Sequence, residues 1–264
     1  MKRRHTACAA LVVGLLLSQG AVAEDARITP KLSTTLQRTC QGEATRLVLM
    51  DQGQAVADAQ PTIERQTRRF RASRAPDGWA FEHSVITPSN ESTLRFETAP
   101  GGAVTTADMS GPSVDALPRN QMYALATATA EDVPERLLLG RSFAVGDSYY
   151  PEDLRRNLLT RAGAGMGLPF AVNGSVDMRY EGQVEFEGRR AWRFAGRITA
   201  SGSGEVSGAA IAVDHGTEAV ILHDAETGLV LKYDTRADTH ISRDGRPFRH
   251  FQKTDAFTCE IIPR

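Results

Sequence analysis

The feature of this 264-residue chain that most constrains its fold is an alternation of apolar and polar residues between Gly174 and Ala200. Val176, Met178 and Tyr180 alternate with charged residues, and the same period resumes at Trp192. Successive side chains of a β-strand point to opposite faces, so a period of two predicts strands with one apolar and one wet face. The pattern favours antiparallel strands over a one-sided core.

Similar strands are indicated in both halves of the chain, at Ile63–Ser73, Trp79–Val85 and Leu229–Tyr233. Gly182 and Gly188 are expected to supply tight reversals between neighbouring strands. The predicted fold class is mainly β: a curved antiparallel sheet, or an open (half) β-barrel, with one or two covering helices.

Helical segments are expected to be few. Pro151–Arg161 is the best candidate, because proline is tolerated in a first turn and the acids that follow suit the positive end of a helix dipole. Gly163–Gly167 should end this helix, which is expected to cover the open mouth of the sheet. Met122–Leu139 is ambiguous between helix and loop. Residues 99–120 indicate a long loop or short broken strands, and Ser201–Gly208 a flexible loop.

The strand Ile63–Ser73 is unusually polar. Because neighbouring side chains of a strand point to opposite faces, its arginines cannot form a single stripe. A wet edge strand that discourages sheet-to-sheet aggregation is the favoured interpretation, and an anion site is the alternative. The arginines concerned are Arg65, Arg68, Arg69, Arg71 and Arg74.

The first 23 residues have the order of a cleavable signal peptide, with basic Lys2–Arg4, apolar Ala9–Leu17 and small Ala21–Ala23. Cleavage is expected after Ala23, and Cys8 would be removed with the signal. The apolar run is too short to span a bilayer as a permanent helix. The expected location of the mature chain is therefore the periplasm.

The mature chain, residues 24–264, is expected to form one β-rich domain, with 40–110 and 137–261 as two meander halves. Its two cysteines, Cys40 and Cys259, lie near its two ends. In an exported protein an isolated pair most often forms a disulfide, although two free thiols are the alternative. The bridge would close a loop of about 220 residues and stabilise the fold by about 4–5 kcal/mol. It would also place the two ends of the mature chain side by side.

The net charge bears on the kind of partner to expect. The chain has 31 basic and 32 acidic residues, and signal cleavage removes three of the basic ones. A weakly acidic protein without a basic block gives no reason to expect nucleic acid or an anionic membrane as a partner. No second run is long and apolar enough to cross a membrane, so no transmembrane segment is expected after signal cleavage.

A search for catalytic chemistry finds no motif. The nearest approach to a nucleophile elbow, Ser201–Gly208, lacks the G-x-S-x-G spacing. We therefore predict no catalytic residues, no cofactor and no metal site, with a zinc or copper site assembled across strands as the alternative. The mature histidines show no metal-pair spacing along the chain, and they are His83, His215, His223, His240 and His250.

Several turn segments resemble those of exported bacterial β-rich proteins. Phe143–Tyr149 resembles a V-x-V-G-D-x-W pattern, with Tyr149 where the pattern has Trp. Tyr180–Gly182, Glu187–Ala191 and Asp224–Leu231 resemble the same proteins. These are similar in build to the lipoprotein carriers of the LolA/LolB type, in which a curved antiparallel sheet wraps helices and holds acyl chains. The resemblance implies that fold over residues 137–260 and offers no catalytic residue to carry over.

Three functions are compared. The favoured one is a non-catalytic binding or carrier module of the bacterial envelope, which holds a lipid or another hydrophobic small molecule on an apolar concave face. The alternative is a structural or assembly factor that pairs with an envelope protein through an exposed sheet edge. A hydrolase with a site scattered over loops ranks third. The aromatic residues that suggest a ligand would equally pack an ordinary core, and these are Trp79, Phe81, Trp192, Phe194 and Tyr233.

Overall fold

The computed structural model describes residues 27–112, 114–155, 158–159 and 170–263. The expected signal peptide and the expected helix stop at Gly163–Gly167 lie outside these residues.

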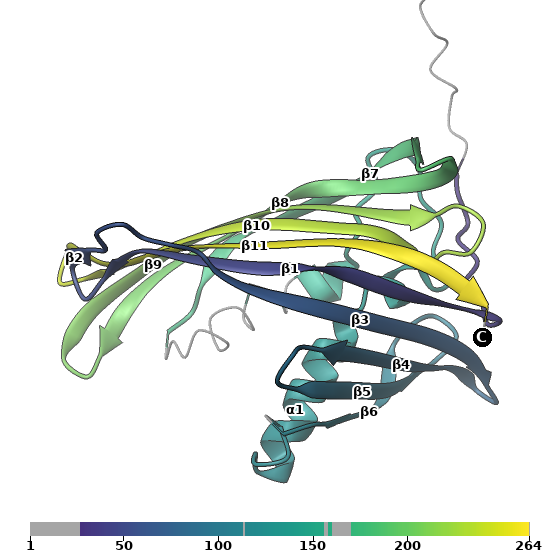
Figure 1. The fold of residues 1–264 in the computed structure, drawn as a ribbon, viewed down its shortest axis with the longest axis horizontal. Coiled ribbons are helices and arrows are strands. Elements are labelled where there is room, and N and C mark those ends of the chain that lie inside the picture. The colour runs from purple at the N-terminus through teal and green to yellow at the C-terminus, as the bar shows by residue number, and fades with distance from the viewer. Residues whose placement is uncertain (1–26, 113, 156–157, 160–169, 264) are drawn as a thin grey trace, which may run out of the picture.

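One open antiparallel sheet of 11 strands dominates the described chain, and it does not close into a barrel (Figure 1). Ten strands follow the order β6-β5-β4-β3-β1-β11-β10-β9-β8-β7, and the short β2 pairs with β1. The predicted mainly β, open and curved sheet is confirmed. The strands are β1 (Leu36–Asp51), β2 (Gln54–Ala55), β3 (Thr62–Ala75), β4 (Gly78–Ile86), β5 (Glu91–Thr98), β6 (Val104–Ser110), β7 (Asn173–Phe186), β8 (Arg189–Val206), β9 (Ala209–Asp224), β10 (Val230–Arg243) and β11 (Arg246–Pro263).

The sheet consists of two meanders that meet where the first strand pairs with the last. β1 pairs with β11 from Leu36↔Pro263 to Met50↔His250, with one irregularity near Met50. Cys40 and Cys259 are directly opposite in this register and form the predicted disulfide. The bridge therefore fixes the alignment of the two strands on which the continuity of the sheet depends.

One face of the sheet, here called the covered face, carries the disulfide and packs against the chain between β6 and β7. Helix α1 (Arg119–Glu131) lies beside β4, β5 and β6, and the short 3₁₀ helix η1 (Arg136–Leu138) follows it (Figure 1). Met122–Leu139, ambiguous in the sequence, is thus two helical pieces, and Pro134 lies between them. Residues 152–155 and 158–159 are helical, in agreement with the helix predicted at Pro151–Arg161.

The covered face supplies the core. On β3 to β6, α1 covers a cluster that includes Phe70, Phe81 and Phe96. On β7 to β11, the chain between η1 and β7 packs against a second cluster that includes Phe194 and Phe257. The opposite face, here called the outer face, carries the polar residues of each alternating strand. Alternation along the strands is therefore expressed as one buried and one wet face, as predicted.

Two local predictions are wrong. Gly182 does not reverse the chain, because it forms a β-bulge within β7, where its φ of +113° favours glycine. Ser201–Val206 is not a loop, since it continues β8 and pairs with β9, leaving Ser207–Gly208 as the turn. Within residues 99–120, the short strand β6 is flanked by turns, which agrees with the prediction of short broken strands there.

The edge-strand interpretation of Ile63–Ser73 is also wrong, because β3 lies inside the sheet between β1 and β4. Its arginines divide between the two faces, as alternation requires. Arg65 and Arg71 pair with Glu43 and Glu82 on the outer face. Arg68 lies on the covered face, where its guanidinium stacks on the ring of Phe257 at 3.8 Å.

One edge of the sheet has a backbone neighbour. The backbone of Gly146–Tyr149 hydrogen-bonds to Met178 and Tyr180 of β7. An isolated bridge between Ser148 and Arg179 adds to this contact. A neighbouring strand could use this part of β7 only after displacing these contacts. At the other edge, α1 packs against the covered face of β5 and β6.

We expect the Cys40→Ala/Cys259→Ala double variant to lose about 4–5 kcal/mol of folding free energy, because the bridge restricts a long loop in the unfolded chain. The bridge joins cysteines 219 positions apart. Urea unfolding of both proteins, with and without reductant, measures this loss. Reductant should shift the midpoint of the wild type and leave that of the double variant unchanged. Equal stabilities of oxidised wild type and double variant would contradict the expectation.

Candidate functional site

A cavity of about 140 Å³ lies on the covered face beside the disulfide. The end of α1 and the turn after it form its roof, and five strands of the sheet form its floor. Its lining combines an apolar wall with several ionisable groups. The residues that line it are Arg38, Cys40, Arg68, His83, Thr129, Asp132, Val133, Pro134, Val230, Tyr233 and Phe257.

A buried ion pair forms one side of this cavity. The Arg38 guanidinium donates through Nε and Nη2 to the two carboxylate oxygens of Glu135, the second at 3.2 Å. The side chain of Arg38 is 4% exposed and that of Glu135 is 0% exposed. The backbone N–H of Val230 also donates to Glu135 Oε1 at 3.2 Å. Glu135 thus binds the covering segment to β1 and β10 at once.

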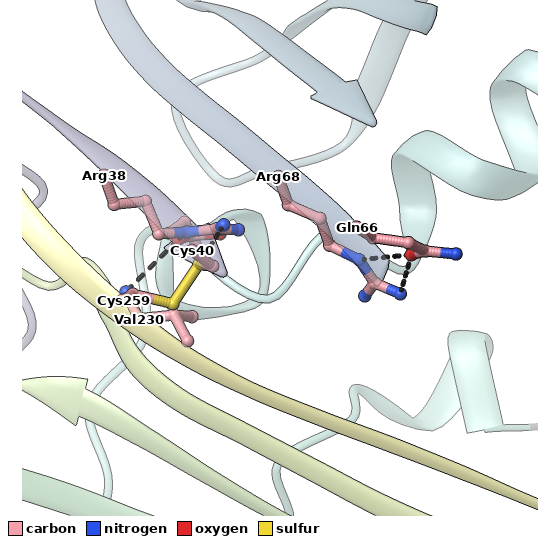
Figure 2. Close-up of a disulfide and its surroundings, with 7 residues drawn as sticks. Arg38, Cys40, Gln66, Arg68, Val230 and Cys259 are labelled. Atoms are coloured by element: carbon pink, nitrogen blue, oxygen red, sulfur yellow. Dashed lines mark hydrogen bonds and ion pairs between the residues drawn. A yellow bond between two sulfur atoms is a disulfide. The ribbon is translucent and has the colours of Figure 1, made fainter. Parts of the chain in front are cut away.

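Opposing effects set the ionisation of Glu135. Burial raises its pKa, but the charge and hydrogen bonds of Arg38 outweigh burial, so the pKa is lower than usual. The carboxylate is therefore ionised at neutral pH and neutralises the arginine. Arg38 also donates through Nη1 to Cys40 Sγ at 3.0 Å, which places the ion pair against the disulfide (Figure 2).

Arg68 is the second cationic group of the cavity. It projects from β3 on the side of the sheet that carries the disulfide, and Nε and Nη2 donate to Gln66 Oε1 at 3.3 and 3.0 Å (Figure 2). Its Nη2 lies 4.0 Å from Asp255 Oδ1, at the limit of an ion pair. Burial lowers the pKa of Arg68, whereas Tyr233 and Asp255 raise it. A guanidinium has five N–H donors in a fixed fork, so it suits an oxygen acceptor in the cavity.

His83 offers a polar atom with no partner. Its Nε2 is buried and makes no hydrogen bond among the described residues. Burial lowers the pKa of His83 to about 3, and the charges of Arg38 and Arg68 add to this shift against the opposing effect of Glu135. The ring is therefore neutral at pH 7. A buried polar atom without a partner in a cavity is typical of a position that a bound molecule or water completes.

A second polar network lies deeper, next to the ion pair. His223 Nδ1 lies 3.0 Å from the carbonyl oxygen of Gly228, and Nε2 lies 3.1 Å from the Tyr149 hydroxyl. Burial lowers the pKa of His223 to about 4, so the ring is neutral at pH 7. The neutral ring then donates from Nδ1 to Gly228, and the single hydroxyl proton of Tyr149 lies within reach of both His223 Nε2 and the carbonyl oxygen of Pro134, each at 3.1 Å. The Tyr149 side chain is therefore fixed in the core.

The five aromatic residues considered as ligand contacts divide into core residues and one residue that lines the cavity. Trp79, Phe81, Trp192 and Phe194 are buried core residues. Tyr233 is the member of that set that lines the cavity, where burial raises the pKa of its hydroxyl to about 12. It lies beneath Arg68, whose guanidinium carbon is 5.9 Å from its ring.

A larger hollow, of about 960 Å³, lies on the outer face. Charged side chains of both signs line it, among them Arg197, Glu218 and Arg236. It is open to solvent and follows the twist of the sheet. The smaller cavity is the stronger candidate because it is more enclosed than this hollow and because the unpartnered Nε2 of His83 belongs to its lining.

Neither a family model nor a curated protein sequence matches this chain. Within the described residues, no helix is long and apolar enough to cross a membrane. Interpretation of the cavity therefore rests on its own geometry.

Sequence reasoning did not identify Arg38, Glu135 or the cavity. Arg38 and Glu135 are 97 positions apart, and neither belongs to a recognisable motif. Arg68 was noted as part of the arginine-rich strand, with an anion site as the less favoured interpretation. The alternation of β3 did contain a usable signal, because it separates Arg68 from Arg69 and places Arg68 on the face of Phe70.

We expect Glu135→Gln to cost about 3–5 kcal/mol of folding free energy, because it leaves the buried Arg38 charge without its partner. Urea unfolding measures this loss. A matched control is Glu82→Gln, whose partners Arg71 and Arg95 are on the surface, where the loss should stay within about 1 kcal/mol. The Arg38→Met/Glu135→Leu variant should recover part of the loss. Similar losses for Glu135→Gln and Glu82→Gln would contradict the expectation.

Stability should fall as the pH falls from about 6.5 towards 4. The pKa values of His83 and His223 drop from 6.5 to about 3 and about 4 on folding, so the unfolded chain binds more protons in this interval. Glu135 adds to the loss at lower pH, since its lowered pKa means that stability disappears as the carboxylate is protonated. Unfolding free energies measured across this pH range test the expectation. His83→Leu should reduce the slope, and a flat curve for the wild type would contradict it.

Proposed function

We propose that this protein is an exported, non-catalytic binding module of the bacterial envelope, and that its ligand is a hydrophobic or lipid-like molecule with a polar end. The observation that carries the proposal is the cavity beside the disulfide, where an apolar wall meets Arg68 and the unpartnered Nε2 of His83. Sites for small ligands are typically apolar, with a few convergent polar groups that fix orientation.

Apolar residues line the cavity from both its roof and its floor. Val133 and Pro134 come from the covering segment, and Val230 and Phe257 come from the sheet. Arg38 is neutralised by Glu135, so the guanidinium that remains for a ligand oxygen is that of Arg68. A polar end group bound to Arg68 and His83 would leave the rest of the molecule against the apolar wall.

The volume of the cavity limits the size of the ligand that fits without a change in the structure. A volume of about 140 Å³ is below the roughly 300–1,000 Å³ of typical small-molecule sites, so it fits an end group and not a whole lipid. Entry of a longer chain requires that the roof move.

Helix α1 is suited to such a movement. Its buried residues are the small Ala126 and Ala130, and the side chain of its N-cap residue, Pro118, makes no capping hydrogen bond. Small contacts and an uncapped end hold a helix weakly. Thr129 of α1 lines the cavity, so displacement of the helix would enlarge it.

The alternative, an assembly factor that pairs through an exposed sheet edge, has less support. At the β7 edge, the backbone of Gly146–Tyr149 already hydrogen-bonds to the strand. The disulfide is consistent with export to an oxidising compartment such as the periplasm.

Native mass spectrometry of the mature chain, isolated from the periplasm without detergent, tests the proposal. We expect a non-covalent mass of lipid size that is lost on denaturation. The Arg68→Gln variant should lose most of this mass. Arg69→Gln is the matched control, because Arg69 is the next residue of β3, is exposed and points to the outer face.

The solvent extract of the denatured sample identifies the ligand class, and a stripped sample is then titrated with a fluorescent fatty acid. Saturable binding that Arg68→Gln weakens and Arg69→Gln retains would support the proposal. A bare chain that also shows no saturable binding would overturn it, as would equal binding by the two variants.

A further inference from the structure

Three potential metal ligands meet on the outer face of the sheet. The cavity lies on the opposite face and shares no residue with them. Asp238 and His240 are two positions apart on β10, so their side chains share a face. His250 of β11 is the cross-strand partner of His240. Thr239, the residue between the first two, is buried on the covered face, so Asp238 and His240 point the other way.

The ligand atoms are close enough to share one ion. His250 Nε2 lies 2.8 Å from Asp238 Oδ1, and His240 Nε2 lies 3.5 Å from the same oxygen. All three ligand atoms lie within 4.8 Å of one another. Ligands at the usual zinc distances of about 2.0–2.2 Å in a tetrahedron are about 3.3 Å apart, so two of these separations already bracket the required value.

The ligand set, two imidazoles and one carboxylate, favours some metal ions over others. Imidazole suits zinc, copper and nickel, whereas magnesium and calcium prefer oxygen ligands alone. The imidazole rings of His240 and His250 are stacked, with centroids 3.9 Å apart and planes at 22°. A small opening of this stack would direct both Nε2 lone pairs at one ion.

The surroundings orient the carboxylate. Gln252 is the cross-strand partner of Asp238 on the same face. On the other side, Asp214 of β9 is the cross-strand partner of His240 on the same face, so it adds negative charge beside the three ligands. Partners of this kind hold metal ligands in place and raise affinity.

We propose that Asp238, His240 and His250 form a zinc-binding site on the outer face. Three ligands leave at least one coordination position for water or for a group from another molecule. The side chains are accessible, with His240 56% exposed and Asp238 46% exposed, so an ion reaches them without any movement of the fold. The site does not depend on the ligand proposed for the cavity.

Calorimetric titration of ZnCl₂ into the mature chain, purified without an affinity tag and stripped with EDTA, tests this site. We expect one saturable zinc ion per chain and no binding of MgCl₂. Asp238→Asn, His240→Asn and His250→Asn should each weaken zinc binding by at least about tenfold. His215→Asn is the matched control, because His215 lies on the covered face, bonded to Thr239 and Thr217, and should leave the affinity unchanged.

Circular dichroism establishes that each variant is folded, and the visible spectrum of bound cobalt(II) reports the ligand set independently of affinity. Loss of that spectrum in the His240 and His250 variants would support the site. Absence of saturable zinc binding would overturn it, and so would variants of all three ligands that bind zinc as tightly as the wild type.

Discussion

The pairing of β1 with β11 is the interaction on which the rest of the structure depends. Each meander is built from neighbouring strands, and in the described sheet the strand pairing that joins the two meanders is that of β1 with β11. The disulfide between Cys40 and Cys259 lies within the pair and fixes its register. The Arg38–Glu135 ion pair lies next to the disulfide and binds the covering segment to the same place. One small region therefore holds the two halves together and positions their cover.

The same region holds the buried ion pair of Arg38 and Glu135. Ionised groups away from water are costly unless they are paired, and Glu135 satisfies this condition through Arg38 and the Val230 N–H. His83 differs, because its Nε2 has no partner among the described residues. A fully satisfied network would serve stability alone, whereas one unsatisfied atom beside a cavity favours recognition of a ligand.

Much of the architecture is contained in local sequence patterns, and much of the candidate site is not. Alternation separates the faces of β3 and so places Arg68 with Phe70 on the covered face. It does not reveal which strands flank β3, which is why an edge position was predicted for an interior strand. His240 and His250 show no metal spacing along the chain, because the distance that matters lies across the hairpin. No local sequence pattern marks Glu135 as a buried ion-pair residue, since its partner Arg38 is 97 positions away.

The sequence by itself determined the fold class, the division of the sheet into one polar and one apolar face, the main turns and the pairing of Cys40 with Cys259. These follow from the period of two, from glycine-containing turns and from the count of cysteines, all of which are local or compositional properties. Only the tertiary structure decided the order of the strands, the cavity under α1 and the meeting of Asp238 with the two histidines. Each of these arises from contacts between residues distant in the chain, and the chain's local chemistry does not specify which distant residues will meet.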